Sequence, residues 1–336
     1  MEHRVDPGSQ QPSGPTGIAR VVDSALEATI AASFTRIGPV LRRRLGKWET
    51  PSPTPGRVVV ITGATSGLGR EAARELATLG CTVVAIGRDA QRLEEVGGEI
   101  ADAGGVAILE RADLADLDDT RALAERLAGH VDRIDVLIHN AGALLNEYQT
   151  GRQGHEVTVT VHVLSPYLLT ELLRPLLDAA DRAKVITMTS GGMYSEAFDL
   201  RTLEMSAERY RGSVAYARAK RAQVVLTAAW QRRQPDATID FHLMHPGWAA
   251  TPGVASSLPR FDSILGPLLR TPREGVDTLV WLATGDSGSP PGGHLWLDRR
   301  ERSFFRLPKT KVDEPTLEAQ GDALISWLTE VTAPST

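Results

Sequence analysis

The segment that most constrains the fold is a short apolar run that ends in a turn with three glycines. Val58-Val59-Val60-Ile61 has the composition of a strand, and Thr62-Gly63-Ala64-Thr65-Ser66-Gly67-Leu68-Gly69 follows it directly. Glycine permits the φ values of a tight turn and lets the backbone approach a pyrophosphate. The helix that starts there would offer unpaired N–H groups to the phosphates. An ordinary glycine-rich turn is the alternative, but the flanking strand and helix favour a dinucleotide site. We expect cofactor contacts from Gly63, Thr65, Ser66, Gly67, Leu68 and Gly69.

Strand-like and helix-like segments alternate from Arg57 to Asp298. Strand character is found at 58–62, 82–86, 106–110, 134–138, 184–189, 239–244 and 294–297. Helical periodicity is found at 68–79, 90–103, 117–128, 154–177, 213–232 and 274–283. This alternation predicts a parallel sheet with right-handed crossover helices, and therefore one α/β domain.

The regions outside this domain differ from it in composition. Residues 1–17 are rich in Pro, Ser, Gln and Gly, which is typical of a disordered tail. Residues 18–55 combine helical spacing, to about Trp48, with a linker that contains Pro51, Pro53 and Pro55. We place the domain at 56–310 and a C-terminal helix or tail at 311–336.

The apolar stripe of the N-terminal helix at 18–48 needs a partner, because an exposed stripe of that size is costly. We expect the helix to pack on its own domain or on a neighbouring subunit of a homo-oligomer. The alternative is a weak contact with a membrane surface, since Arg42-Arg43-Arg44 would suit anionic headgroups. Asp23 and Glu27 interrupt the stripe and weaken that alternative.

Composition excludes several classes of protein and site. The chain of 336 residues has a net charge of -5 and a pI of about 5.9, which argues against a nucleic-acid partner. Cys81 is the only cysteine, so neither an intrachain disulfide nor a cysteine-rich zinc site can form, and we expect no metal. No apolar run reaches the roughly 18 residues of a membrane span. The residues to about Pro15 lack the order of a signal peptide, so we expect a cytoplasmic protein.

Far downstream, Tyr216-Ala217-Arg218-Ala219-Lys220 places a phenol and an ammonium on one helical face. A nearby ammonium lowers the pKa of a phenol from its ordinary value near 10. Tyr216 can then exchange a proton with a carbonyl or alcohol oxygen while a hydride moves. Ser190 follows the strand at 184–189, and its hydroxyl can bond the same oxygen. A Tyr-x-x-x-Lys pair alone is common on helices. With the glycine turn, it predicts Ser190, Tyr216 and Lys220 as catalytic residues, the last two also touching the cofactor.

The end of the second strand indicates which dinucleotide is bound. It reads Ile86-Gly87-Arg88-Asp89, whereas an acidic residue at the tip would bind the ribose hydroxyls of NAD. The Arg88 guanidinium can hold a 2′-phosphate with two hydrogen bonds. We therefore expect NADP(H) in preference to NAD(H). The alternative is that Arg88 is solvated and that Asp89 turns to the ribose.

Several motifs, taken in this order, resemble the short-chain dehydrogenase/reductase family. The matching positions are Thr62–Gly69, Asp113-Leu114, Asn140-Ala141-Gly142, Ser190, Tyr216, Lys220, Pro246-Gly247 and Thr251. The resemblance spans about 57–298. It implies a single Rossmann-type doubly wound parallel sheet of about seven strands, with helices on both faces, here preceded by the N-terminal helical extension.

The resemblance also implies roles for residues near the cofactor. Asp113 and Leu114 would meet the adenine, and Asn140 would shape the floor under the cofactor. The nicotinamide would be bordered by Pro246, Gly247 and Thr251.

One position departs from the family. The family usually has an asparagine in the helix after the fourth strand, where it holds a water that links the lysine to solvent. His162 takes that place in Val159-Thr160-Val161-His162-Val163-Leu164. It can hold such a water, relay protons itself, or pack as a core histidine.

Two partly apolar segments predict a lid over a hydrophobic carbonyl or alcohol, although surface loops with a small core of their own would look the same. Their apolar residues are Met193, Tyr194, Phe198, Leu200, Leu203 and Met205, and Pro252, Val254, Leu258, Phe261, Ile264 and Leu265. The leading hypothesis is an NADP(H)-dependent oxidoreductase for a carbonyl/alcohol pair. The alternative is a non-catalytic dinucleotide sensor or scaffold. A sugar epimerase or dehydratase would need another glycine spacing and a larger C-terminal part.

Overall fold

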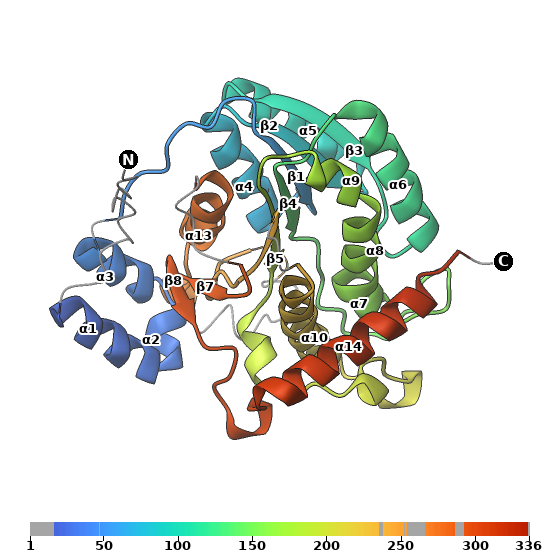
Figure 1. The fold of residues 1–336 in the computed structure, drawn as a ribbon. Coiled ribbons are helices and arrows are strands. Elements are labelled where there is room, and N and C mark those ends of the chain that lie inside the picture. Colours follow the sequence, from blue (N-terminus) through green and yellow to red (C-terminus); the bar gives the residue numbers. More distant parts are fainter. Residues whose placement is uncertain are drawn as a thin grey trace, which may run out of the picture.

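The computed structural model describes residues 17–46, 48–234, 238–251, 253, 266–285 and 292–334. At its centre lies one sheet with the strand order β3-β2-β1-β4-β5-β6-β7-β8 (Figure 1). The strands are β1 (Val58–Thr62), β2 (Thr82–Gly87), β3 (Val106–Arg111), β4 (Val136–His139), β5 (Ala183–Met188), β6 (Ile239–Met244), β7 (Leu295–Leu297) and β8 (Arg300–Arg302). Neighbouring strands from β3 to β7 pair in parallel, which confirms the predicted Rossmann-type fold.

The sheet has eight strands instead of about seven, because the chain turns back after β7. Asp298 and Arg299 have φ values of 54° and 53°, as in a two-residue hairpin, and β8 pairs antiparallel with β7. The sequence hides this hairpin, since Asp-Arg lacks the glycine that usually marks such a turn and β8 consists of charged residues.

Helices cover both faces of the sheet (Figure 1). One face carries α4 (Gly67–Thr78), α5 (Ala90–Asp102) and α13 (Pro272–Thr284), and the other carries α6 (Leu117–His130), α8 (Ser165–Leu172) and α10 (Gly212–Arg232). Alternation along β1 divides its side chains between two cores. Val59 and Ile61 pack with the first set of helices, and Val60 packs with the second.

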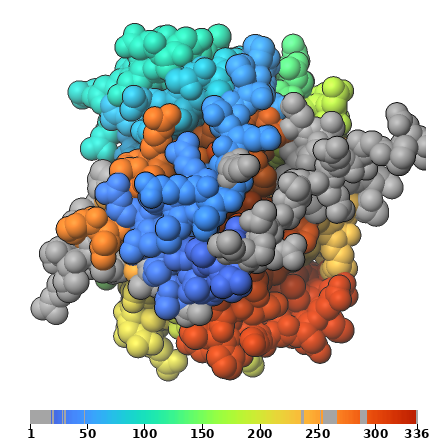
Figure 2. Space-filling model, turned by 90° about the vertical axis from the view of Figure 1, so that its left-hand side faces the viewer, coloured from blue at the N-terminus to red at the C-terminus, as the bar shows by residue number. Residues whose placement is uncertain are grey.

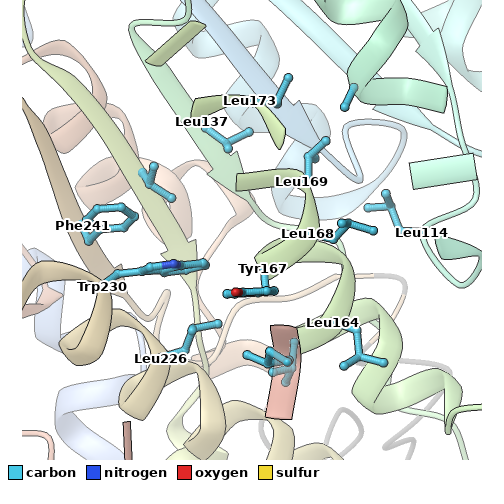
Figure 3. Close-up of a cluster of buried hydrophobic side chains, with 14 of the residues drawn as sticks. Leu114, Leu137, Leu164, Tyr167, Leu168, Leu169, Leu173, Leu226, Trp230 and Phe241 are labelled. Atoms are coloured by element: carbon cyan, nitrogen blue, oxygen red, sulfur yellow. The ribbon is translucent and has the colours of Figure 1, made fainter. Parts of the chain in front are cut away.

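Aromatic rings hold α10 on its face of the sheet. Trp230 stacks between Tyr167 and Phe241, with centroid distances of 6.2 and 5.2 Å (Figure 3). The C-terminal helix α14 (Glu314–Val331) packs across α10, and its Thr329 hydroxyl hydrogen bonds with the Tyr167 hydroxyl at 2.7 Å. These contacts anchor the helix on which Tyr216 and Lys220 lie.

The helix expected at 154–177 is interrupted. It consists of α7 (Val157–Val159), a π-helical turn, η1 (Thr160–Leu164), then α8 and α9 (Arg174–Asp178). Pro166 has no N–H to donate to the His162 carbonyl four residues earlier. The Gln223 side chain of α10 donates to that carbonyl instead, at 3.0 Å. The helix therefore continues through His162 as a π-turn, and the predicted single helix is wrong at Leu173, where a turn separates α8 from α9.

The N-terminal extension forms three short helices instead of the single helix expected over 18–48. They are α1 (Gly17–Ala28), α2 (Ile30–Phe34) and α3 (Ile37–Gly46). Thr29 separates the first two, and its hydroxyl donates to the Leu26 carbonyl. Figure 2 shows the extension (blue) over one side of the molecule, beside the orange segment that includes α13. An ion pair between Arg36 and Glu274 of α13 bridges this boundary.

A buried cluster of charges joins the extension to the end of the sheet. Arg42 of α3 is 1% exposed and donates to Asp298 at 2.5 Å, to Asp23 at 2.7 Å and to Glu27 at 2.8 Å. Asp298 also accepts from Arg270, at 2.6 and 3.0 Å. The sequence suggested that Arg42 and the two arginines after it form one basic surface. The structure buries Arg42 and exposes only the other two.

Candidate active site

The turn after β1 has the conformation that its glycines predicted. Gly63 and Gly67 have φ values of 67° and 53°. The helix α4 begins at Gly67, and the Ser66 side chain makes no capping bond, which leaves the first N–H groups of the helix to an anion. A Cβ on Gly69 would lie 2.2 Å from the Gly63 carbonyl oxygen, so only glycine lets the helix approach the turn this closely. This geometry fits a dinucleotide pyrophosphate.

Asn140, after β4, ties the turn to the next strand. Its side-chain amide donates to the carbonyls of Thr62 and Gly63, at 2.9 and 3.1 Å. The main-chain N–H groups of Asn140 and Ala141 both donate to the Thr62 hydroxyl at 3.0 Å. Asn140 therefore fixes the turn from beneath, where the resemblance places the floor under the cofactor.

Thr65 of the turn lies against the tip of β2. A Cβ on Gly87 would come within 2.4 Å of the Thr65 methyl group, so a side chain at this tip would have to displace Thr65. Asp89 does not turn back to the tip. It caps α5 by accepting a hydrogen bond from the Arg92 N–H at 3.1 Å. The tip of β2 therefore presents no carboxylate.

An open depression beside this tip is lined by Arg88, Arg111, Asp113 and Asp119. The sequence did not single out Arg111. It ends β3 in register with Gly87, and its guanidinium donates to the Arg88 carbonyl at 3.1 Å. Its place at the carboxyl end of the neighbouring strand was the signal that could have identified it. Two guanidinium groups thus lie at this end of the site.

Asp113 and Leu114 follow β3 at the same edge. The carboxylate of Asp113 accepts from the Ala115 N–H at 3.0 Å, and the Asp113 N–H donates to Asp119 at 2.7 Å. Leu114 is buried, and its carbonyl accepts from the Ser165 hydroxyl at 2.7 Å. These bonds hold Asp113 at the surface, where the resemblance places the adenine.

The structure brings Ser190, Tyr216 and Lys220 together. Ser190 follows β5 and accepts from the Gly192 N–H at 3.2 Å, and a Cβ on Gly192 would lie 3.7 Å from both the Ser190 hydroxyl oxygen and the Tyr216 ring. Lys220 is buried and donates to the Met188 carbonyl at 2.8 Å. Its Nζ lies 5.5 Å from the centre of the Tyr216 ring. A substrate oxygen placed against the two hydroxyls would receive two hydrogen bonds.

Burial controls the protonation of these groups. It raises the pKa of Tyr216, and the nearby Ser190 hydroxyl offsets only part of that rise. Burial also lowers the pKa of Lys220 to about 7. The expectation that Lys220 lowers the pKa of the phenol is therefore wrong here. The Lys220 Nζ lies over the ring of Tyr216, and its amine is partly neutral near pH 7.

His162 is buried beside the tyrosine. The two rings are perpendicular, with centroids 5.3 Å apart. Its Nδ1 lies 2.7 Å from the Thr158 carbonyl oxygen, so Nδ1 carries the proton and Nε2 is an acceptor. Within the part of the chain that the structure describes, Nε2 has no hydrogen-bond partner. Burial and the charge of Lys220 lower the pKa of His162 to about 3, so the ring stays neutral.

The turn after β6 lies close to the N-terminal extension. Gly247 has a φ of 71°, and a Cβ there would lie 2.3 Å from Nε of Arg270 and 2.6 Å from the Phe34 carbonyl oxygen. Pro246 precedes it, and the partly buried Thr251 continues the same segment. These three predicted residues thus share one stretch of chain at the carboxyl edge of the sheet.

The structure tests only part of the expected lid. In the first apolar segment, Met193 and Tyr194 are buried against residues that include Phe34, Val224 and Leu243, and Leu203 is part of the large core. In the second segment, 252 and 254–265 lie outside the described residues.

Among the residues that the structure describes, no group of three or more His, Cys, Asp or Glu side chains could hold a metal ion. Cys81 is a buried free thiol. None of the helices in the described ranges is both long enough and apolar enough to cross a membrane.

Comparison with known proteins agrees with this geometry. A family model described as short chain dehydrogenase matches residues 57–260. Human dehydrogenase/reductase SDR family member 12 is 36% identical over 267 residues, which cover 79% of this chain and 83% of that protein. Mouse retinol dehydrogenase 14 is 32% identical over 292 residues, which cover 81% of this chain and 86% of that protein. A solved Escherichia coli CFT073 structure, complexed with NADPH, is 25% identical with a TM-score of 0.60, and the match covers 75% of this chain and 100% of that chain.

Three runs next to the site carry a closer resemblance to family member 12. They are Ser190–Met193, Lys220–Thr227 and Met244–Ala249. The family model covers more than half of the chain, and the first relatives are more than 30% identical over most of it. The chain therefore belongs to the short chain dehydrogenase family and is an oxidoreductase that acts on CH–OH or C=O groups with NAD(P).

Proposed function

We propose that this enzyme uses NADP(H) in preference to NAD(H) to interconvert a carbonyl and an alcohol on an apolar substrate, with Tyr216 as proton donor and acceptor. The dinucleotide supplies or accepts the hydride when it is bound. The glycine turn after β1, Asn140 and the residues after β3 and β6 would hold it. The protein's own contribution is to position the substrate oxygen and to move its proton.

The end of β2 supports the preference for NADP(H). Position 87 is a glycine, a side chain there would displace the Thr65 methyl group, and Asp89 is engaged as a helix cap. Arg88 and Arg111 line the adjacent depression and can bind a phosphate in bidentate fashion. The Escherichia coli relative, which was solved with NADPH, shows that such a fold accepts this cofactor.

Tyr216 is suited to give a proton to a carbonyl oxygen. Its pKa is raised by burial, so the phenol carries its proton at neutral pH. As the carbonyl oxygen gains negative charge during reduction, Tyr216 donates this proton, and Ser190 stabilises the same oxygen with its hydroxyl. In the reverse direction only the deprotonated form of Tyr216 can accept the alcohol proton, and the raised pKa of Tyr216 makes that form scarce at neutral pH.

Relatives support the apolar substrate. Retinol dehydrogenase 14 is named for an apolar alcohol, and it shares 32% identity over 81% of this chain. A panel of carbonyls that ranges from short polar aldehydes to long-chain and polycyclic ketones, followed by NADPH oxidation, would test this choice. Faster turnover of the short polar members would contradict it.

The observation that carries the proposed activity is the meeting of Ser190, Tyr216 and Lys220 at the carboxyl edge of the sheet. Tyr216→Phe should remove turnover while the Kd for NADPH stays within about twofold, because the ring packs and only the proton is lost. Wild-type rates in this variant would refute the proton role. No turnover by the wild type on any carbonyl would favour the dinucleotide sensor or scaffold.

The preference for NADP(H) has its own test. Arg88→Ala and Arg111→Ala should each weaken NADPH binding by about 1.5–3 kcal/mol, with little effect on NADH. Arg92→Ala is the control, because Arg92 lies on the adjacent helix and its only ion pair within the described part of the chain, at 3.8 Å, is with Asp89. Equal affinity of the wild type for both cofactors would refute the preference.

We also propose a cytoplasmic location, which the free thiol of Cys81 supports, since a reducing compartment keeps thiols unpaired. Cell fractionation would test it. Co-sedimentation with anionic vesicles would test a weak membrane contact through Arg43 and Arg44, and size-exclusion chromatography would test a homo-oligomer.

A further inference from the structure

Phe34, the last residue of α2, links the N-terminal extension to the active-site edge of the sheet. Its side chain is 2% exposed. A Cβ on Gly191 would come within 2.7 Å of Cε2 of the Phe34 ring, so the ring lies directly on the backbone next to Ser190. Only glycine at position 191 admits an aromatic ring at this distance.

The same residue holds the turn after β6. The Phe34 carbonyl accepts from the Trp248 N–H at 2.7 Å. Its ring lies edge-on to His245 and Trp248, with centroid distances of 4.5 and 5.7 Å. His245 and Trp248 flank Pro246 and Gly247 in the chain, so Phe34 contacts both sides of the turn that borders the expected nicotinamide position.

A cluster of buried charged residues holds the backbone at Phe34 in place. Arg270 donates to the Phe34 carbonyl at 2.9 Å and to the Ser33 carbonyl at 2.7 Å. The Asp298 carboxylate holds Arg270 and also accepts from Arg42 of the extension. Phe34 cannot shift without disturbing this buried ion cluster, so its ring is a rigid contact for both turns.

We propose that Phe34 is a positioning residue of the active site, which sets the separation between the turn that carries Ser190 and the turn that contains Gly247. The inference rests on the proposed function, because it assigns these turns to the substrate oxygen and the nicotinamide. Phe34 acts through Gly191 and Trp248, and it does not itself take part in proton transfer. A misplacement of about 1 Å at reacting groups costs on the order of 100-fold in rate.

The first test compares two buried residues of the extension. Phe34→Ala removes the ring from both turns, whereas Leu26→Ala removes a buried side chain of α1. Both variants should lose thermal stability. Only Phe34→Ala should lower kcat by about tenfold or more. The Kd for 2′,5′-ADP, a probe without nicotinamide, should change by less than about twofold in both. Parallel losses of kcat in the two variants would overturn the proposal.

A double-mutant cycle separates positioning from general destabilisation. Gly191→Ala should lower kcat in the wild-type background, because the new methyl group meets the Phe34 ring at 2.7 Å. In the Phe34→Ala background the ring is gone, and the same change should cost little. If the effects of the two substitutions on kcat are additive, the contact between Phe34 and position 191 is not the cause of the loss.

Amide hydrogen exchange provides a measurement that needs no substrate. Phe34→Ala should speed exchange at 190–195 and 246–250, while Leu26→Ala should leave both stretches unchanged. If the wild type reduces no carbonyl, the proposed function fails and the exchange data decide alone. Unchanged exchange in Phe34→Ala would then overturn the positioning role. Phe34→Leu, which keeps most of the apolar volume, replaces the alanine variant if that variant does not fold.

Discussion

Asp298 should be one of the residues on which the stability of the protein depends most. Its carboxylate is buried and accepts hydrogen bonds from two guanidinium groups, those of Arg42 and Arg270, which are each 1% exposed. Asp298→Asn preserves the shape of the side chain, and asparagine tolerates the φ of 54° at this position. The substitution therefore removes the negative charge with little other change.

The expected loss follows from the partners that each arginine retains. Arg42 keeps Asp23 and Glu27, so its charge remains compensated. Arg270 keeps main-chain carbonyls, and no other carboxylate pairs with it among the described residues. Removal of one partner from a buried ion pair costs about 3–5 kcal/mol. We expect about 3 kcal/mol for Asp298→Asn, since the amide oxygen still accepts one hydrogen bond.

Urea denaturation of the wild type and the variant would measure this loss. Asp322→Asn is a matched control, because Asp322 also lies between two arginines, Arg232 and Arg233, but is 52% exposed. It should lose less than about 1 kcal/mol. Equal losses in the two variants would show that burial does not determine the strength of the Asp298 cluster.

Three further predictions concern the site. Gly69→Ala should weaken NADPH binding by about tenfold or more, as measured by calorimetric titration, because the new Cβ would lie 2.2 Å from the Gly63 carbonyl oxygen. The pKa of Lys220, about 7, is below that of an unfolded lysine, so the unfolded chain binds more protons between about pH 7 and 10. The free energy of unfolding of the wild type, relative to that of Lys220→Met, should therefore rise across that window by about 1 kcal/mol per pH unit. Denaturation of both proteins at several pH values would measure it, and a difference that does not change with pH would contradict the prediction. Nε2 of His162, which has no partner among the described residues and lies beside Tyr216, is placed to accept a hydrogen bond from water. His162→Leu should therefore lower kcat by about tenfold with little change in melting temperature, while His162→Asn should keep more of the rate. Equal rates in the two variants would mean that the ring only packs.

Local sequence predicted the sheet well because each strand is a short apolar run between turn residues. The strand expected at 239–244 has the same bounds in the structure as β6 (Ile239–Met244). The glycine turn also follows from local rules, since Gly63 and Gly67 take the positive φ that favours glycine. The strand β8 could not be predicted this way, because its charged residues pair only once the Asp298–Arg299 hairpin has formed.

The extension shows what periodicity cannot resolve. Apolar spacing over 18–48 is compatible with one helix, yet the chain breaks after α1 and after α2. The Ser33 hydroxyl donates to Glu27 across the first break, a local bond that competes with helix continuation. Arg42 is buried by Asp298, which lies 256 residues away in the chain. A partner so distant in the chain cannot be inferred from the local sequence pattern.

At the site, the order of the motifs predicted which catalytic residues would lie near one another, but not every residue that lines the cofactor end. Ser190 follows β5 and Tyr216 lies on α10, and the two side chains lie on either side of the same point at Gly192. Arg111 was missed, since an arginine at a strand end is common and only the register with Gly87 gives it meaning.

The charge environments of Arg42 and Lys220 were both predicted wrongly, because segments distant in the sequence remove these side chains from water. Arg42 has the sequence context of a surface cation. Burial opposes its charge, but the carboxylates of Asp298 and Asp23 outweigh that effect and raise its pKa. Lys220 has the context of a charged partner for a phenol, yet it has no carboxylate beside it in the described structure, and burial lowers its pKa to about 7. Two buried cations thus shift in opposite directions because only one of them is met by carboxylates. The residue types at a site can be inferred from sequence, whereas the charge that each carries is set by which remote segments pack against it.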